Sequence, residues 1–130
     1  MKRLTVTAGI IRKNSGILLA QRKKSDFAGG LWEFPGGKLE PGESLRECLR
    51  RELLEELSIN ALIGDFLTEV RHTYDDFHVH LFVFLVPGFS GEILIRDHQR
   101  TAWVCAEYLS SYSLLPADIP VAEVLLKRLT

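Results

Sequence analysis

Residues 37–59 read GKLEPGESLRECLRRELLEELSI, and this stretch decides the fold because it joins a glycine-rich turn to an acid-rich helix. The preceding run Pro35–Gly37 predicts a tight loop, since glycine accepts positive φ and lets other backbone approach closely. Ser44 and Glu47 have the spacing of a capping box, which predicts that a helix begins beside this loop. A turn and a helix are therefore expected to be held against each other.

Three glutamates of the predicted helix fall on its inward side. Counting about 100° per residue, Glu52, Glu55 and Glu56 share one face, and that face overlaps the apolar stripe. A solvated helix places its charges opposite the stripe, where Glu47 and Arg51 lie. Close carboxylates repel one another unless cations hold them, and oxygen ligands at this density favour Mg²⁺ or Mn²⁺. In the alternative interpretation the acids are solvated and Glu47 pairs with Arg51 at i and i+4.

This stretch resembles the sequence motif of the Nudix hydrolases. The motif reads Gly, five residues, Glu, seven residues, Arg-Glu, an apolar residue, any residue, Glu-Glu, any residue, Gly, an apolar residue. One position departs from it, because Ser58 stands where the motif has glycine, so the end of the helix must accept a side chain. The positions that agree are Gly37, Glu43, Arg51, Glu52, Leu53, Glu55, Glu56 and Ile59.

The resemblance extends along nearly the whole chain, to the MutT-type and CTP-pyrophosphohydrolase-type members of the family. It implies an α/β (α+β) fold, an αβα sandwich with a mixed, mostly antiparallel central sheet, as one domain over residues 1–130. It also implies a Mg²⁺-dependent enzyme that converts a nucleoside triphosphate to its monophosphate and pyrophosphate. The segments that carry it outside the motif are VTAGII (6–11), ILLAQR (17–22), LWEFPGG (31–37) and PADIP (116–120).

By this resemblance, the metal ligands and catalytic residues lie on and around the acid-rich helix. Glu52 and Glu56, with the backbone carbonyl of Gly36, are the expected direct ligands. Glu55 ligates a further ion or positions the attacking water. Asp97 lies where relatives carry an acid that joins the metals or acts as general base; its alternative is a solvated loop acid. In the same way Glu43 is expected to pair with Arg51, holding loop and helix together.

The expected substrate contacts lie outside the helix. Arg22 matches an arginine that similar enzymes use on phosphates, for which a guanidinium fork is suited; a surface ion pair is the alternative. Lys38 could reach the same phosphates from the glycine loop. Asp118 is expected against the base edge, with Phe34 near the stacking region. Asp118 could instead cap a helix that Pro120 begins.

The substrate itself is not decided by the motif. Oxidised or modified nucleotides such as 8-oxo-dGTP, or CTP and dCTP, fit the resemblance best, and cleansing of the nucleotide pool is the implied task. ADP-ribose or a dinucleoside polyphosphate would keep the same catalytic residues. A binding module without catalysis would be marked by loss of the acids, yet Glu52, Glu55 and Glu56 are all present.

Composition agrees with a compact enzyme of 130 residues, of which 46% are hydrophobic. The net charge of −1 and pI near 6.4 do not favour nucleic acid as a partner. Cys48 and Cys105 are expected to be reduced and buried. No signal peptide opens the chain and no apolar run approaches ~18 residues, so we expect a cytoplasmic monomer or homodimer without a membrane partner.

Hydrophobic patterns place the remaining elements. Strands are predicted where β-branched and aliphatic residues cluster, and the turn Asn14–Gly16 predicts a hairpin between the first two. The strand at 78–86 is apolar on both faces, which is typical of a central strand covered on both sides. Residues 89–92 are expected to form a loop. The other predicted strands cover 4–11, 17–21, 61–70 and 100–104, and a helix is predicted over 120–129.

Overall fold

A computed structural model describes residues 1–129 and has two long strands at its centre. These are β1 (Lys2–Lys13) and β7 (Phe77–Val86), which pair in parallel from Lys2↔Phe77 to Ile11↔Val86. Strand β7 lies between β1 and β6 (Phe66–Thr73), so the prediction of a central strand there is confirmed.

Seven strands form the main sheet, and every pairing in it except β1 with β7 is antiparallel. The predicted mixed, mostly antiparallel sheet is therefore confirmed. Five strands run in the order β3-β2-β1-β7-β6, while β4 pairs with β1 and β9 with β2. The strands not yet bounded are β2 (Gly16–Arg22), β3 (Trp32–Glu33), β4 (Gly36–Lys38) and β9 (His98–Cys105).

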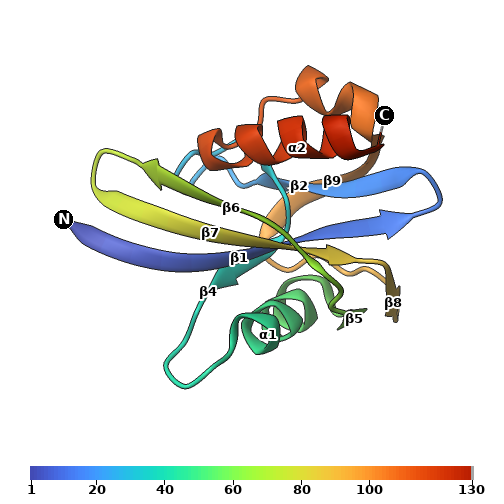
Figure 1. Cartoon of the computed structure of the whole chain (residues 1–130), viewed down its shortest axis with the longest axis horizontal. Helices are drawn as coiled ribbons and strands as arrows, with labels where there is room; N and C mark the ends of the chain where they lie inside the picture. The colour runs from blue at the N-terminus through green and yellow to red at the C-terminus, as the bar shows by residue number, and fades with distance from the viewer. Residues whose placement is uncertain (130) are drawn as a thin grey trace.

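Helices cover both faces of this sheet, which gives the three-layer sandwich visible in Figure 1. Helix α1 (Leu45–Leu57) lies on one face, and α2 (Ile119–Leu129) lies on the other beside the short helices η1 (Ala106–Ser111) and η2 (Pro116–Asp118). Alternate residues of β7 point to opposite faces: Val83 packs in the core toward α2 and Phe84 in the core toward α1.

Two predicted segments differ from the structure. The expected strand over residues 61–70 is divided into β5 (Asn60–Leu62) and β6, because the backbone at Gly64 and Asp65 turns to bond with Leu85. The expected loop over residues 89–92 begins with β8 (Gly88–Ser90), which pairs with β5 in a small second sheet. The local amino-acid pattern does not predict this pairing, because the two strands lie far apart in the sequence.

Other expectations hold with shifted boundaries. The hairpin turn is confirmed, and Asn14 adopts φ 57°. Cys48 and Cys105 are both free thiols; Cys48 is buried, whereas Cys105 is only partly buried. Among the described residues, no helix is long and apolar enough to cross a membrane.

Candidate active site

Helix α1 begins where the sequence predicted. The Ser44 hydroxyl accepts from the backbone N–H of Glu47 at 3.1 Å, and the Glu47 carboxylate accepts from the N–H of Ser44 at 2.8 Å. Both bonds of the capping box are therefore present. Leu49, Leu53 and Leu57 are fully buried, which fixes the rotation of the helix and hence the direction of its acids.

The predicted glycine loop is instead strand β4, and its glycines do not have positive φ. They are required by close approach: a Cβ at Gly36 would overlap the carbonyl of Thr7, and one at Gly37 would overlap the carboxylate of Glu52. The strand pairs with β1, and α1 packs directly over it. Because Gly37 has no side chain, the Glu52 carboxylate of the helix can lie against the sheet.

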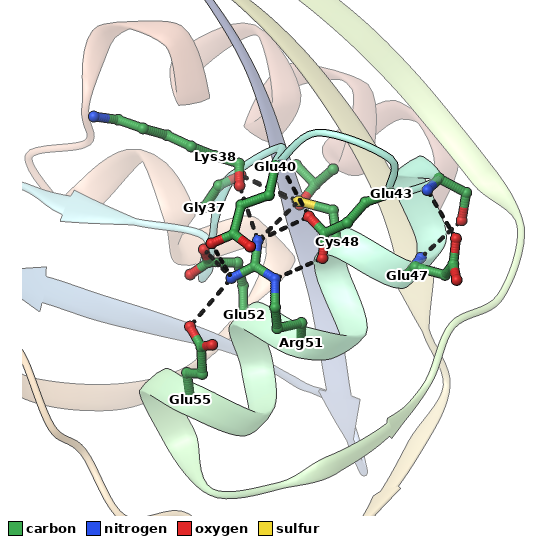
Figure 2. Close-up of polar contacts among 11 residues, drawn as sticks. Gly37, Lys38, Glu40, Glu43, Glu47, Cys48, Arg51, Glu52 and Glu55 are labelled. Carbon is green, nitrogen blue, oxygen red and sulfur yellow. Dashed lines mark hydrogen bonds and ion pairs between the residues drawn. The ribbon is translucent and has the colours of Figure 1, made fainter.

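Arg51 is the centre of the polar contacts between α1 and the chain that precedes it (Figure 2). Its guanidinium donates to both oxygens of Glu43, at 2.6 and 2.9 Å, so the predicted Glu43 pairing is confirmed. It also donates to Glu52 at 2.9 Å, to Glu55 at 3.1 Å and to the carbonyl of Lys38 at 3.0 Å. The expectation that Arg51 lies on the solvated side of the helix was therefore wrong.

These contacts stabilise the charged forms of Glu43 and Arg51. Hydrogen bonds from Arg51 hold the pKa of Glu43 at about 2, below its usual range, and the pKa of Arg51 is raised chiefly by its bonds to Glu43. The alternative pairing of Arg51 with Glu47 does not form, because the Glu47 carboxylate is used in the cap. Arg51 thus holds loop and helix together.

A hollow of about 540 Å³ is lined by carboxylate side chains and by glycine backbone. Glu52, Glu56 and Asp97 line it, together with the backbone of Gly36 and Gly37. Burial raises the pKa of Glu52. It also raises the pKa of Glu56, where the nearby charge of Asp97 adds to the effect. Poorly solvated acidic groups are thus concentrated in this hollow.

Glu55 does not share this position. The sequence placed it on one face with Glu52 and Glu56, but the structure turns it outward, with a half-exposed side chain bonded to Arg51 and outside the lining of the hollow. Glu52 and Glu56 are about one helical turn apart and point in similar directions, whereas Glu55 is rotated about 100° from Glu56 around the helix.

Arg22 and two residues that the sequence analysis missed form a chain of contacts in the wall of the same hollow. Arg22 donates to Glu33 at 3.1 Å and to the carbonyl of Phe27 at 2.7 Å. The other oxygen of Glu33 lies 2.8 Å from Nε2 of His98. Antiparallel pairing of β2 with both β3 and β9 assembles these residues, and that register is not visible in the sequence. Arg22 therefore forms an ion pair and still faces the hollow.

A second hollow of about 430 Å³ adjoins the first and is mostly apolar. Phe34 and Asp118 line it with residues of β1 and β7, while Arg22, Glu33, Gly36, Gly37 and Lys38 line both hollows. Lys38 is exposed at their junction. The two hollows are therefore adjoining parts of one site.

Asp118 is an ionisable residue buried in the wall of the second hollow, with 3% of its surface exposed. Its Oδ2 accepts from the backbone N–H of Phe34 at 2.9 Å. This bond ties the residue that follows β3 to the end of η2, and it differs from the bond to the first turn that a helix cap would make. Burial raises the pKa of Asp118 to about 8, despite the bond from Phe34.

The described residues, 1–129, contain no group of three or more His, Cys, Asp or Glu side chains already arranged to hold a metal. The physical reason is visible at Arg51, which draws Glu52 and Glu55 to itself. The donor set still suits a hard divalent cation, because Glu52 and Glu56 offer carboxylate oxygens whose negative charge is poorly solvated.

Comparison with known proteins assigns the family. The sequence model of the NUDIX domain matches residues 1–127. The chain belongs to the NUDIX domain family. CTP pyrophosphohydrolase of Escherichia coli K12 is 43% identical over 123 residues, which cover 95% of this chain and 91% of that protein. An 8-oxo-dGTP diphosphatase of Proteus vulgaris is 41% identical over 93 residues, which cover 71% of this chain and 83% of that protein.

Solved structures agree with this NUDIX assignment. The crystal structure of the MutT protein from Methanosarcina mazei superposes with a TM-score of 0.90 at 26% identity, covering 99% of this chain and 96% of that one. The predicted Nudix sandwich is thereby confirmed. As in Nudix hydrolases generally, a divalent metal ion is required for the chemistry.

Proposed function

We propose that this Nudix hydrolase is a Mg²⁺-dependent pyrophosphohydrolase that converts a nucleoside triphosphate and water to a nucleoside monophosphate and pyrophosphate. One observation carries the proposal: the acidic hollow adjoins the apolar hollow, since the two share lining residues. A triphosphate beside the acids would therefore place its base in the apolar hollow. The related CTP pyrophosphohydrolase and 8-oxo-dGTP diphosphatase support the reaction class.

For the metal, we assign Glu52, Glu56 and the backbone carbonyl of Gly36 as direct ligands, with Asp97 and Glu55 as further ligands or as the base that orients water. Mg²⁺ fits these all-oxygen donors, and Mn²⁺ could replace it. When bound, the cation neutralises the charge of the phosphate oxygens and makes attack by water easier. Glu55 can take part only by leaving Arg51.

For the phosphates, we assign Arg22 and Lys38. Glu33 and the carbonyl of Phe27 hold the Arg22 guanidinium in the wall of the hollow, so little conformational freedom is lost when it binds. Lys38 has no such restraint on its exposed side chain and would act as a mobile positive charge. Both side chains reduce the repulsion that a polyphosphate meets beside the acids.

For the base, we assign Phe34 and Asp118. The Phe34 side chain is buried in the wall of the apolar hollow, and the Asp118 carboxyl lies beside it. Because its pKa is about 8, Asp118 is mostly protonated at neutral pH and could donate as well as accept a hydrogen bond. Both cytosine and 8-oxoguanine present donors and acceptors, so CTP, dCTP and 8-oxo-dGTP are the proposed substrates.

We further infer that residues 1–130 form a single domain, although Thr130 lies outside the described residues, and that the protein is a cytoplasmic monomer or homodimer. Support comes from a family match over residues 1–127 and from two free thiols, which suit a reducing compartment. The net charge of −1 supports a small nucleotide over a nucleic acid polymer as partner.

The test is release of pyrophosphate with Mg²⁺ from CTP, dCTP, 5-methyl-dCTP, 8-oxo-dGTP, dGTP, ADP-ribose and a dinucleoside polyphosphate, with all products identified. We expect monophosphate and pyrophosphate from a cytosine or 8-oxoguanine nucleotide. Glu52→Gln should reduce kcat by orders of magnitude while nucleotide affinity changes little. Glu107→Gln, at an exposed position of η1, is the matched control, and its kcat should equal that of the unaltered protein. No product from any substrate would favour a binding module instead.

A further inference from the structure

His98 makes contacts on both sides of its ring at the start of β9. Its side chain is 8% exposed, and its Nε2 lies 2.8 Å from the Glu33 carboxylate. Its Nδ1 points the other way, to the Glu56 carboxylate at 4.0 Å. One imidazole therefore lies between the glutamate that holds Arg22 and a glutamate of the acidic hollow.

The Nδ1 atom is buried and lacks a hydrogen-bond partner, unlike every other buried side-chain nitrogen or oxygen of the described residues. An unsatisfied buried polar atom costs roughly 1–3 kcal/mol, so such atoms in folded proteins generally have a reason. The nearest ionic group is the Glu56 carboxylate, and its 4.0 Å separation exceeds a hydrogen bond by about 1 Å. With a hydrogen on Nδ1, the ring would donate to the Glu56 carboxylate after a small movement of that side chain.

We propose that His98 is a positioning residue, which holds the Glu56 carboxylate in place for the divalent metal and ties it to the Arg22–Glu33 pair. This inference rests on the proposed function, since it assumes that Glu56 is a metal ligand. Carboxylates that bind metals are commonly oriented by hydrogen bonds from a second layer of side chains. His98 is the buried side chain here that can make such a bond while also contacting the phosphate side.

The contacts form a continuous chain from Arg22 through Glu33 and His98 to Glu56. Because each link joins side chains on different strands or on α1, the chain connects the predicted phosphate site with the predicted metal site. A purely packing role would fill the same space without depending on either ring nitrogen. Variants that keep a nitrogen at either the Nδ1 or the Nε2 position of His98 therefore distinguish a packing role from a positioning role.

Amide side chains provide these variants. The amide of His98→Gln reaches the Nε2 position and keeps the bond to Glu33, whereas that of His98→Asn reaches only the Nδ1 position, facing Glu56. The matched control is His80→Gln, because His80 makes the same kind of contact, 2.6 Å from Glu69, on a strand face outside the acidic hollow. Each variant is examined for Mn²⁺ binding without nucleotide, by electron paramagnetic resonance, and for KM and kcat with Mg²⁺.

We expect His98→Gln to bind Mn²⁺ about tenfold or more weakly, the usual effect of losing such an outer contact, with KM near that of the unaltered protein. His98→Asn should bind Mn²⁺ nearly as the unaltered protein does and should raise KM, because Arg22 and Glu33 lose their support. His80→Gln should change neither quantity. Thermal unfolding of each variant identifies any general loss of structure.

Mn²⁺ binding by His98→Gln equal to that of the unaltered protein would overturn the proposal, as would equal losses in both amide variants. This outcome is separable from failure of the proposed function. Mn²⁺ binding is measured without turnover, so an inactive protein whose Mn²⁺ affinity still depends on His98 would contradict only the proposed reaction. An active protein whose Mn²⁺ affinity does not change when His98 is replaced would contradict only the positioning role.

Discussion

At the scale of single residues, two kinds of contact build the site, one between neighbours in the sequence and one between residues on distant strands. Glu43, Arg51 and Glu52 have fixed spacings within one continuous stretch, so their proximity follows from one helix and its leading loop. Glu33 and His98 are brought together by strand pairing across 65 positions of sequence. Only the register of β2 with β3 and β9 makes them neighbours, and no spacing rule gives that register.

Asp118 provides a prediction at this scale. Its pKa is about 8 in the folded chain, against about 4 for an unfolded aspartate, so the folded state binds the proton more tightly. Its contribution to stability is therefore complete below about pH 4 and is lost as the pH rises to about 8. Asp118→Asn keeps an acceptor for the Phe34 N–H and cannot ionise, so its advantage in unfolding free energy should grow over that interval.

Urea unfolding at several pH values between 5 and 9 measures this difference. Exposed Asp76→Asn is the control, and its difference from the unaltered protein should stay small throughout. An Asp118→Asn difference that is independent of pH would show that the carboxyl of Asp118 is not held protonated by burial.

At the scale of elements, α1 was predictable because three local signals agree: the capping box, the apolar stripe and the acid-rich sequence. Strand β4 was not predictable, because glycine suits both tight turns and places where other chain segments approach closely. Only the contacts of β4 with β1 and α1 show that close approach is the reason here. The division of residues 61–70 into β5 and β6 was also missed, since it depends on bonds from Gly64 and Asp65 to β7.

The end of α1 provides a prediction at this scale. Ser58 ends the helix with φ 60° and ψ 30°, a left-handed conformation that costs a residue with a side chain roughly 1–2 kcal/mol. Ser58→Gly should therefore stabilise the protein by about 1 kcal/mol, after allowing for the more flexible unfolded chain, and should raise Tm by roughly 3–5 °C. Ser110→Gly, whose φ is not positive, is the matched control and should lower Tm or leave it unchanged.

Differential scanning calorimetry of both variants measures these changes in Tm. A Tm for Ser58→Gly at or below that of the unaltered protein would mean that the serine makes compensating contacts at the end of the helix. Activity should be retained, because Ser58 is outside the lining of both hollows.

At the scale of the whole molecule, the sandwich brings distant segments to one site. The acids come from α1 and the segment before β9, the glycines from β4, and the base-side residues from the position after β3 and from η2. The sheet between the helices fixes these segments, and the bond from the Phe34 N–H to Asp118 joins positions 84 residues apart in the sequence. The central claim is that one nucleotide spans both hollows.

The most direct test follows backbone amides by nuclear magnetic resonance while the protein, with Mg²⁺, is titrated with a non-hydrolysable α,β-methylene analogue of its fastest triphosphate substrate. Phe34 lines only the apolar hollow and reports on it, and Asp97 lines only the acidic hollow and reports on that one. We predict that both amide signals shift with one common Kd. Shifts confined to one hollow, or two different dissociation constants, would contradict a single nucleotide spanning both.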